Sequence, residues 1–195
     1  MWSNMDIKSY INNSIKTKTE ILNNEKFLFL IEEVAQVIVK AYSEGKKVLT
    51  AGNGGSAGDA QHIVGELVSK VFIERPALGA IALTTDTSVI TAISNDFGYE
   101  EVFARQIQAN AKSGDVFITI STSGNSKNII KALEVAKTKG VVTVGLTGEK
   151  ECKMDELCDY IIHVPSDCTP IIQESHIMIS HIICAKVEES LFKKE

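Results

Sequence analysis

Hydrophobic residues follow two patterns along the chain, helical spacing and short continuous runs. Over residues 27–42 apolar side chains recur every three or four positions, which predicts a helix that ends at Glu44-Gly45. Five later runs are short, almost wholly apolar and rich in β-branched residues, which is typical of strands covered on both faces. The predicted strands are residues 47–51, 80–83, 116–120, 141–146 and 160–164.

Segments with helical patterns separate these predicted strands. We expect helices over residues 56–70, 87–111, 126–139, 151–157 and 170–192. The alternation predicts an α/β fold of three layers, in which helices flank a parallel five-stranded sheet. In this interpretation the 195 residues form a single domain, with an N-terminal helical segment (1–44) and an α/β core (45–195).

Composition and charge narrow the class of protein. The chain is 44% hydrophobic and 23% charged with a net charge of −5, a globular balance that argues against nucleic acid as a partner. No apolar run approaches the roughly 20 residues of a membrane span, and residues 1–13 lack the order of a signal peptide, so we expect a cytoplasmic protein. The four cysteines form no C-x-x-C pair, and we expect them to be reduced and structural.

Two loops after predicted strands carry the candidate ligand-binding residues. Residues 46–63 and 114–133 share one plan, in which a strand leads into a loop of small and hydroxylated residues and then into a helix. Because ligands of α/β sheets bind at the carboxyl ends of the strands, both loops are expected to open onto the same edge.

The second loop, residues 121–126 (STSGNS), favours an anion. It carries four hydroxyls and one glycine directly before a helix, where free backbone N–H groups and the helix dipole attract negative charge. The alternative is an ordinary helix capped by Ser or Asn. Four hydroxyls exceed what capping needs, so phosphate is the predicted ligand.

The first loop, residues 52–57 (GNGGSA), also fits the G-x-G-x-x-A pattern of dinucleotide sites. That pattern needs an acidic residue at the end of the next strand, and Glu74, at the right distance, precedes the strand. A P-loop is excluded because no G-K-[ST] follows. We favour a sugar-sized ligand bonded through Asn53 and Ser56.

Two further features offer reactive groups. His62 and Glu66 are four residues apart and so share one helix face, and burial of Glu66 in its apolar stretch would raise its pKa toward that of a working base. The alternative is a surface pair. The apolar stretch 171–187 is interrupted by polar residues, which are costly unless paired or used, although a hydrogen-bonded core histidine is the commoner explanation for either histidine alone. These residues are Gln173, Glu174, His176 and His181.

Four segments together resemble the phosphoheptose isomerases of the sugar isomerase (SIS) fold family. Residues 51–67, 81–106, 120–133 and 164–182 match the family's motifs in order and spacing over nearly the whole chain. The resemblance implies a flavodoxin-like SIS fold and a homotetramer. It also implies conversion of sedoheptulose 7-phosphate to D-glycero-D-manno-heptose 7-phosphate through an enediolate, the first step of bacterial ADP- or GDP-heptose biosynthesis.

The resemblance further implies roles for individual residues. Glu66 and His181 fall on the proton-transfer pair, and one zinc ion per subunit falls on His62, Glu66, Gln173 and His181. The substrate-binding positions are Asn53, Gly54, Gly55, Ser56, Glu66, Asn95, Asp96, Ser121, Thr122, Ser123, Ser126 and Gln173.

Some positions depart from the family's pattern, and one pair of predicted metal ligands is hard to reconcile with a single metal ion. Gln173 and His181 are about 12 Å apart along a regular helix, so one metal meets both only if the two side chains reach toward each other or the helix starts after Gln173. The other possibility is that residues of a neighbouring subunit complete the site. Relatives usually carry Arg at the positions of Lys70 and Ile171, and Asp is common at Cys168. These departures put the substrate's preferred stereochemistry in question.

Two other functions remain as alternatives, and both use the same fold. One is a non-catalytic SIS-fold binding protein of the replication-initiator-associating type, which lacks the glutamate and the late histidine; the other is a pentose-phosphate isomerase.

A separate argument concerns assembly. The apolar faces of residues 27–42 and 171–187 exceed what one sheet covers, which predicts burial across two-fold axes in a tetramer.

Overall fold

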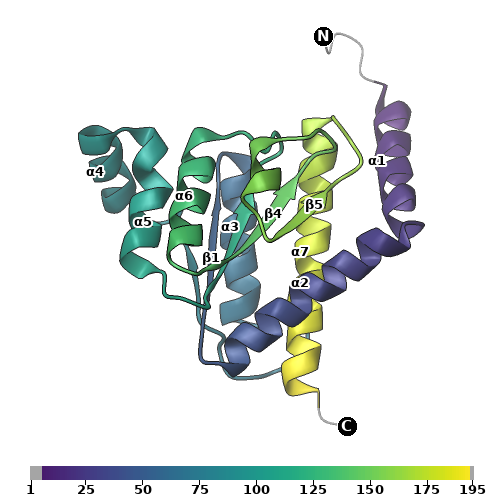
Figure 1. Ribbon diagram of the computed structural model, residues 1–195. Coiled ribbons are helices and arrows are strands. Elements are labelled where there is room, and N and C mark those ends of the chain that lie inside the picture. Colours follow the sequence, from purple (N-terminus) through teal and green to yellow (C-terminus); the bar gives the residue numbers. More distant parts are fainter. Residues whose placement is uncertain (1–5, 194–195) are drawn as a thin grey trace.

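One parallel sheet organises the chain in a computed structural model, which describes residues 6–193 (Figure 1). Its strands lie in the order β2-β1-β3-β4-β5, and all neighbours pair in parallel. All five predicted strands are confirmed, each bound lying within one residue of its expected place. The strands are β1 (Val48–Gly52), β2 (Ala80–Ala82), β3 (Val116–Ile120), β4 (Val142–Thr147) and β5 (Tyr160–His163).

Helices cover both faces of the sheet, as the alternating pattern predicts. On one face pack α2 (Glu25–Ser43), α3 (Gly55–Val68) and α7 (Thr169–Phe192), and on the other α5 (Val102–Asn110) and α6 (Lys127–Thr138). Strand β3 shows why: Ile118 and Ile120 join the core under the first set of helices, whereas Phe117 joins the core under the second. Side chains alternate across a strand, so a wholly apolar strand feeds both cores.

Two predicted helices differ in the structure. The single helix expected over 87–111 is wrong, because Gly98, at φ +91°, ends α4 (Thr87–Phe97), and the short 3₁₀ turn η1 (Tyr99–Glu101) precedes α5. A positive φ suits glycine and stops a helix, although the apolar spacing continues across the break. The segment 151–157 forms only a 3₁₀ turn, η2 (Lys153–Glu156).

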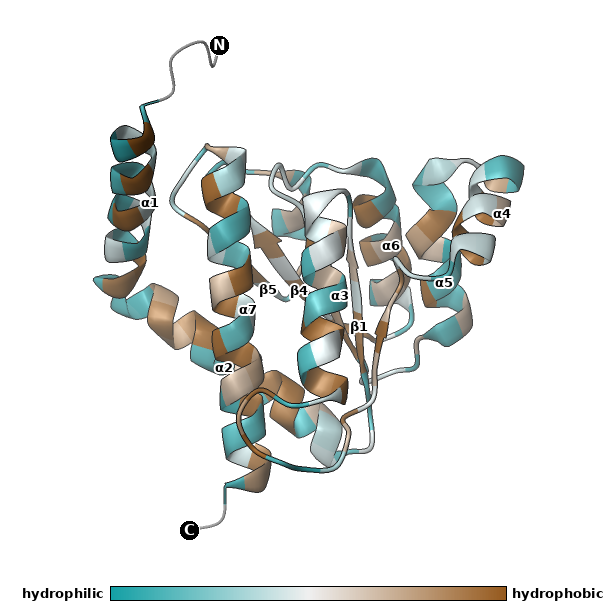
Figure 2. Ribbon diagram, turned by 180° about the vertical axis from the view of Figure 1, so that it is seen from behind, coloured by the Kyte–Doolittle hydropathy of each residue, from teal (hydrophilic) through white to brown (hydrophobic). Residues whose placement is uncertain are grey.

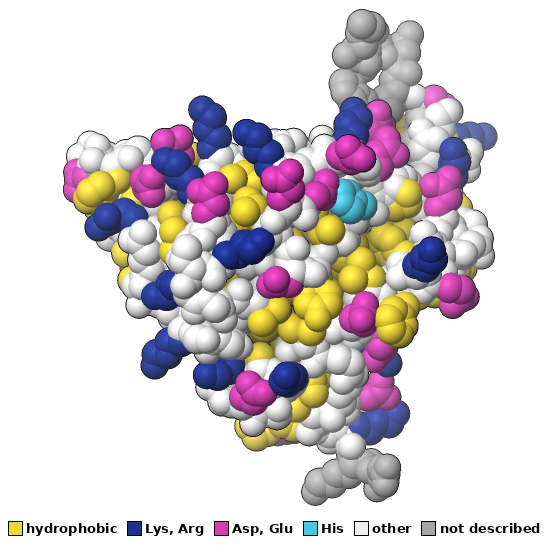
Figure 3. Space-filling view, viewed as in Figure 1, with side chains coloured by type: hydrophobic (Ala, Val, Ile, Leu, Met, Phe, Trp, Pro, Cys, Tyr) yellow, Lys and Arg dark blue, Asp and Glu magenta, His cyan; other side chains and the backbone are white. Residues whose placement is uncertain are grey.

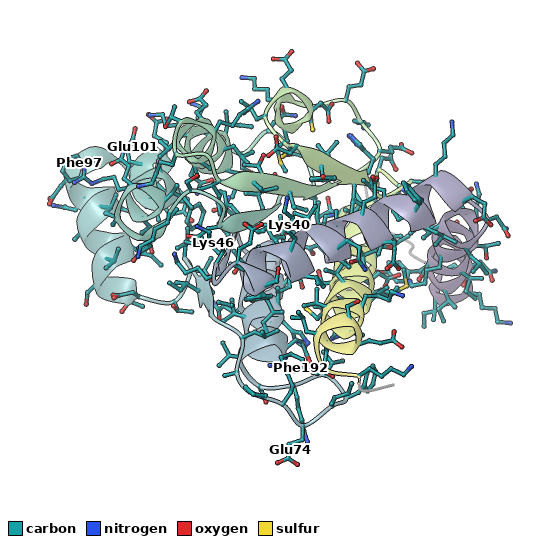
Figure 4. All side chains as sticks on the ribbon, turned by 60° about the horizontal axis from the view of Figure 1, so that its bottom comes forward. Lys40, Lys46, Glu74, Phe97, Glu101 and Phe192 are labelled. Carbon is teal, nitrogen blue, oxygen red and sulfur yellow. The ribbon has the colours of Figure 1, made fainter. Side chains whose placement is uncertain are left out.

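The N-terminal helices and the exposed apolar residues revise the argument about assembly. The apolar face of α2 packs on α7, so the two helices expected to leave apolar surface bury most of it against each other, while Phe29 of α2 and Ile182 of α7 stay exposed. Exposed apolar side chains line α1 (Ile7–Leu22), and α4 has no buried residue. Figure 4 shows Phe97 at the outer end of α4. The exposed apolar side chains of α1 are Ile7, Ile11, Ile15 and Leu22.

The surface adds two constraints. None of the helices within residues 6–193 is long and apolar enough to cross a membrane. Acidic and basic side chains are interspersed over the face in Figure 3, which therefore carries no continuous basic patch of the kind that binds nucleic acid.

The connection order places the candidate site. From β1 the chain moves to β2 on one side, and from β3 it moves to β4 and β5 on the other. The loops after β1 and β3 therefore flank the crevice where the strand order reverses, which is the usual ligand position in open α/β sheets.

A buried carboxylate ties the starts of these two strands together. Asp115, whose side chain is 2% exposed, accepts the backbone N–H of Lys47 at 3.1 Å and of Lys112 at 2.8 Å, and it pairs with the Lys47 ammonium. Burial alone would raise the pKa of Asp115, but the hydrogen bonds from Lys47 and Lys112 outweigh it and hold the pKa below its usual value.

We predict that Asp115→Ala lowers the free energy of unfolding at pH 7 by about 2–3 kcal/mol, because charged hydrogen bonds are lost and two N–H groups lose their acceptor. A group with a lowered folded pKa stabilises above its unfolded pKa, near 3.9, and loses that effect as the pH falls through the folded value. Urea titrations should therefore show the difference between variant and wild type shrinking below about pH 4. An equal difference in the free energy of unfolding at pH 7 and below about pH 4 would contradict this assignment.

Candidate active site

The hydroxyl loop after β3 presents donors that its own helix does not use. Ser126 is the N-cap residue of α6, yet its side chain makes no capping hydrogen bond. Its Oγ instead lies 3.1 Å from the Oγ of the buried Ser121. Capping therefore does not explain these serines, and the arrangement suits an oxyanion at the start of α6.

A cavity of about 290 Å³ opens beside this loop. Thr122 and Ser123 line it on one side, and the loops after β4 and before α7 line it on the other. Lys150 is the only basic residue among its lining residues, and Thr169 adds a hydroxyl at the start of α7. The cavity is large enough for part of a sugar, but three carboxylates also line it, so the start of α6 suits phosphate better than the cavity itself. These are Glu149, Glu151 and Asp167.

The loop after β1 is joined directly to the hydroxyl loop's helix. Asn53 and Asn128 exchange two amide hydrogen bonds, both of 2.9 Å, and the Tyr99 hydroxyl donates to Asn53 Oδ1 at 3.0 Å. The Asn53 side chain, predicted to bond a sugar hydroxyl, is thus engaged within the protein. Neither Asn128 nor Tyr99 was among the predicted site residues, and only the segments that contain them gave a signal.

The glycines of this loop allow close packing. A Cβ on Gly52 would lie 2.4 Å from the Ser56 carbonyl oxygen, and one on Gly55 would lie 2.6 Å from Gln173 Nε2. Ser56 is buried in the first turn of α3, and Gly54 adopts φ +56°. The close approach places Gln173 of α7 at the start of α3, beside the predicted sugar-binding loop.

A second group of reactive side chains lies further along the same two helices. His62 Nε2 is 2.8 Å from His181 Nε2 and 3.0 Å from Glu66 Oε1, and His181 Nε2 is 3.9 Å from the same Glu66 oxygen. The imidazole rings meet edge to face with centroids 4.8 Å apart. We call these three residues the His–Glu–His cluster.

The cluster forms because α3 and α7 run side by side in the same direction (Figure 2). Gln173 meets Gly55 near the start of both helices, and His181 meets His62 about two turns later. Since α7 begins at Thr169, Gln173 is helical and remains about 12 Å along the axis from His181. Within one chain, the structure brings together three of the four predicted zinc ligands and leaves Gln173 apart.

The donor set of the cluster fits zinc. Two imidazole nitrogens and a carboxylate oxygen lie within 4.8 Å of one another. Imidazole and carboxylate are usual zinc ligands, and three protein ligands leave a position open in the manner of a catalytic site.

Glu66 is not enclosed as expected. Its side chain is 21% exposed and those of His62 and His181 are each 46% exposed, so the cluster faces solvent. The predicted apolar enclosure of Glu66 is wrong because the helix turns that residue toward the two histidines rather than toward the core. Glu66 also lies eleven residues beyond Gly55, about 16 Å along the helix axis. The cluster and the loops are therefore separate halves of a site within one chain.

Other candidate residues from the sequence make contacts apart from the two loops and the His–Glu–His cluster. Asn95 donates to Asp96 at 2.8 Å on the exposed side of α4, and no hydrogen bond within residues 6–193 links either to the two loops. His176 is a buried core histidine that bonds the Thr147 carbonyl at 3.1 Å, and burial lowers its pKa to about 4. Glu174 pairs with Lys18 at 2.6 Å, which joins α7 to α1.

The departures from the family's pattern lie around the ends of α3 and α7. Lys70 is exposed just after α3, and Ile171 is buried in the first turn of α7. Cys168 is the N-cap residue of α7 without a side-chain cap hydrogen bond. Where the resemblance implies a guanidinium, this chain thus has a flexible ammonium at one position and apolar packing at the other.

Comparisons with known proteins decide the family. The SIS domain profile matches residues 9–148. A phosphoheptose isomerase from Aneurinibacillus thermoaerophilus is 60% identical over 97% of this chain and 96% of its own length. Phosphoheptose isomerase 2 of Campylobacter jejuni is 58% identical over 98% and 95%. The solved phosphoheptose isomerase from Francisella tularensis superposes with a TM-score of 0.89 at 36% identity, covering 94% of this chain and 96% of that one.

The chain belongs to the phosphoheptose isomerase family. The resemblance seen in the four sequence segments is thereby confirmed, as are the α/β fold and the assignment to aldose–ketose isomerases. Neither a non-catalytic SIS-fold binding protein nor a pentose-phosphate isomerase is favoured by these relatives.

The hydroxyl loop after β3 leads to a testable prediction at Gly124. This residue adopts φ +61°, and a Cβ there would lie 2.1 Å from Cys152 Sγ. Gly124→Ala should therefore distort the loop and lower the affinity for inorganic phosphate at least 10-fold. Calorimetry measures this affinity. Gly45→Ala is the matched control, since Gly45 has φ +70° but nothing within 4 Å of its Cβ position. Equal phosphate affinity in both variants would place the anion elsewhere.

Proposed function

We propose that the protein converts sedoheptulose 7-phosphate to D-glycero-D-manno-heptose 7-phosphate in the cytoplasm, as a homotetramer with one zinc ion per subunit. The observation that carries the proposal is the presence of two half-sites, a hydroxylated loop at the start of α6 that suits phosphate and a cluster on α3 and α7 that suits proton transfer. The family's isomerase activity supplies the reaction class.

In the phosphate half, Ser121, Thr122, Ser123 and Ser126 bind the phosphate with the N-terminus of α6. The backbone of Gly54 and Gly55, with Ser56 and Gln173, positions the sugar hydroxyls near the start of α3. The Asn53–Asn128 pair holds the two loops at a fixed separation. Rigid positioning of this kind lowers the entropy lost as the substrate reaches a reactive geometry.

In the proton-transfer half, Glu66 acts as the base. It removes the proton from the carbon beside the carbonyl to give an enediolate and returns it to the neighbouring carbon. Both contacts to the histidines use Glu66 Oε1, which leaves Oε2 to take the proton. When its Nε2 holds no metal, His181 shuttles the proton between the substrate oxygens. A zinc ion held by His62, Glu66 and His181 would stabilise the negative oxygen of the enediolate.

We place the complete site between subunits. Within one chain the cluster lies about 10–16 Å along α3 from the sugar-binding loop. Its histidines are half exposed, whereas proton transfer to an enediolate requires shelter from water. Gln173 of a neighbouring subunit would then complete the cluster. The exposed apolar residues of α1 and the unburied α4, which carries Asn95 and Asp96, supply surface for such contacts.

We predict that Glu66→Gln abolishes turnover while the protein stays folded and binds substrate, because removal of a general base costs about 10²–10⁴-fold in rate. The assay incubates the protein with sedoheptulose 7-phosphate and follows aldose signals by NMR. Pentose 5-phosphates serve as competing substrates. Wild-type turnover in the variant would remove Glu66 from the mechanism, and turnover of the pentose phosphates alone would overturn the proposed substrate.

The shared site predicts complementation between inactive variants. Light scattering should give about four times the 21.2 kDa subunit mass. Mixing Glu66→Gln subunits with Ser121→Ala/Ser123→Ala subunits should restore part of the activity, because some mixed sites receive an intact cluster and an intact loop. Mixing Glu66→Gln with His181→Ala is the matched control and should restore none, since both residues belong to the same half-site. An active monomer, or equal activity in both mixtures, would contradict the shared site.

A further inference from the structure

A buried ion pair joins α7 to the loop that follows α3. Arg75 Nε lies 3.1 Å from Glu188 Oε2, and both side chains are only 1% exposed. Arg75 belongs to the loop between α3 and β2, and Glu188 lies near the end of α7. Charged side chains are rarely this well buried unless they are paired, and the pair is far from the loops that bind phosphate.

The Glu188 carboxylate organises the loop backbone. It accepts the N–H groups of Val71 at 2.9 Å, Phe72 at 2.6 Å and Ile73 at 2.7 Å. Burial alone would raise the pKa of Glu188, but these hydrogen bonds and Arg75 outweigh it and hold the pKa below its usual value. The carboxylate therefore stays charged and fixes three consecutive peptide groups against α7.

Arg75 carries the connection onward to α3 itself. Its NH2 group donates to the carbonyl of Glu66 at 2.9 Å, and its NH1 group donates to the carbonyl of Leu67 at 2.7 Å. These carbonyls belong to the last turn of α3, which has no intrahelical donors for them. One guanidinium thus binds the main chain of the proposed base and the side chain of an α7 residue.

The position of this contact along the helices matches that of the His–Glu–His cluster. Glu188 lies seven residues after His181, about two helical turns, and therefore on nearly the same side of α7. Figure 4 shows Glu74 projecting from the tip of the loop and Phe192 at the end of α7 beside it. The Phe192 ring packs 5.6 Å from the Arg75 guanidinium carbon, which completes the enclosure.

We propose that Arg75 and Glu188 are positioning residues for the His–Glu–His cluster, which they align by locking the end of α3 to α7. The inference rests on the proposed function of that cluster. Apolar contacts between the helices, such as those of Leu67 and Ile183, are not directional and tolerate small axial shifts. A reactive constellation tolerates only about 0.5 Å, and a shift of one residue is about 1.5 Å.

The energetics favour this role over simple stabilisation. A buried ion pair is costly to desolvate, and well-packed apolar residues are often as stable in its place. Its directional hydrogen bonds to named carbonyls and N–H groups supply what apolar residues cannot, a single register between two helices.

The test uses two variants that differ in residual charge. Arg75→Lys keeps the charge but loses the fork that reaches two carbonyls and Glu188 together. Arg75→Met/Glu188→Gln removes both charges and keeps an oxygen acceptor for the loop N–H groups, so no unpaired charge is left buried. Lys186→Met is the matched control, because Lys186 pairs with Glu32 of α2 from the same stretch of α7.

The readouts are kcat, KM and zinc affinity, the last by competition with a chelating dye. We expect kcat to fall about 10- to 100-fold and zinc affinity to fall about as much, as for other outer contacts of metal ligands, with KM changed less than about 3-fold. Lys186→Met should leave all three unchanged. Thermal unfolding confirms that each variant is folded at the assay temperature.

Each outcome decides the proposal. Wild-type kcat and zinc affinity in both Arg75 variants, or a rise in KM with unchanged kcat, would overturn the positioning role. If the wild-type protein binds zinc but does not turn over sedoheptulose 7-phosphate, the proposed function fails and zinc affinity alone decides the role of Arg75. If it turns over substrate without binding zinc, the split between kcat and KM decides.

Discussion

Two helices that start at the same edge of the sheet, α3 and α7, run side by side along its outer face. Because their directions agree, residues at equal depths meet: Gln173 with Gly55, His181 with His62, and Glu188 with the loop after α3. Reversal of either helix would separate all three pairs. The sheet imposes the common direction, since each helix follows a parallel strand and returns across the same face. The chemistry of the site therefore depends on the handedness and topology of the fold more than on any loop.

The phosphate half depends on the strand order in another way. Loops after β1 and β3 meet because the connections diverge between these two strands, and the Asn53–Asn128 pair then holds them together. The hydroxyls of Ser121 and Ser126, which lie 3.1 Å apart and make no capping hydrogen bond, belong to the loop at this crevice. A fixed edge of this kind would bind an anion without rearrangement, which suits a substrate that the protein must hold while its other end reacts.

Short-range patterns predicted most of the fold and only part of the site. The strands were predictable because burial on both faces leaves a continuous apolar run, as Val116–Ile120 shows. The break at Gly98 was missed because the apolar spacing of α4 continues into α5, and only the backbone angle reveals it. The two predicted zinc ligands on one helix follow from the spacing of His62 and Glu66. Their meeting with His181, 119 residues away, and the Arg75–Glu188 pair, 113 residues apart, depend on how two helices align and carry no periodic signal.

The open position of the His–Glu–His cluster is the reason for proposing that a second copy completes the site. A base that faces water shares its proton with the solvent, and a charged intermediate there gains little from fixed protein groups. Enclosure within the chain would require a helix over the α3–α7 seam, but α2 already lies beneath α7 and α1 extends beyond it. In the proposed tetramer another copy would cover the seam. The loop after β1 and Gln173, at the start of the same two helices, lie apart from these reactive groups within one chain. Two copies related by a two-fold axis can bring the two halves together, since each contributes its cluster to one site and its loops to the other.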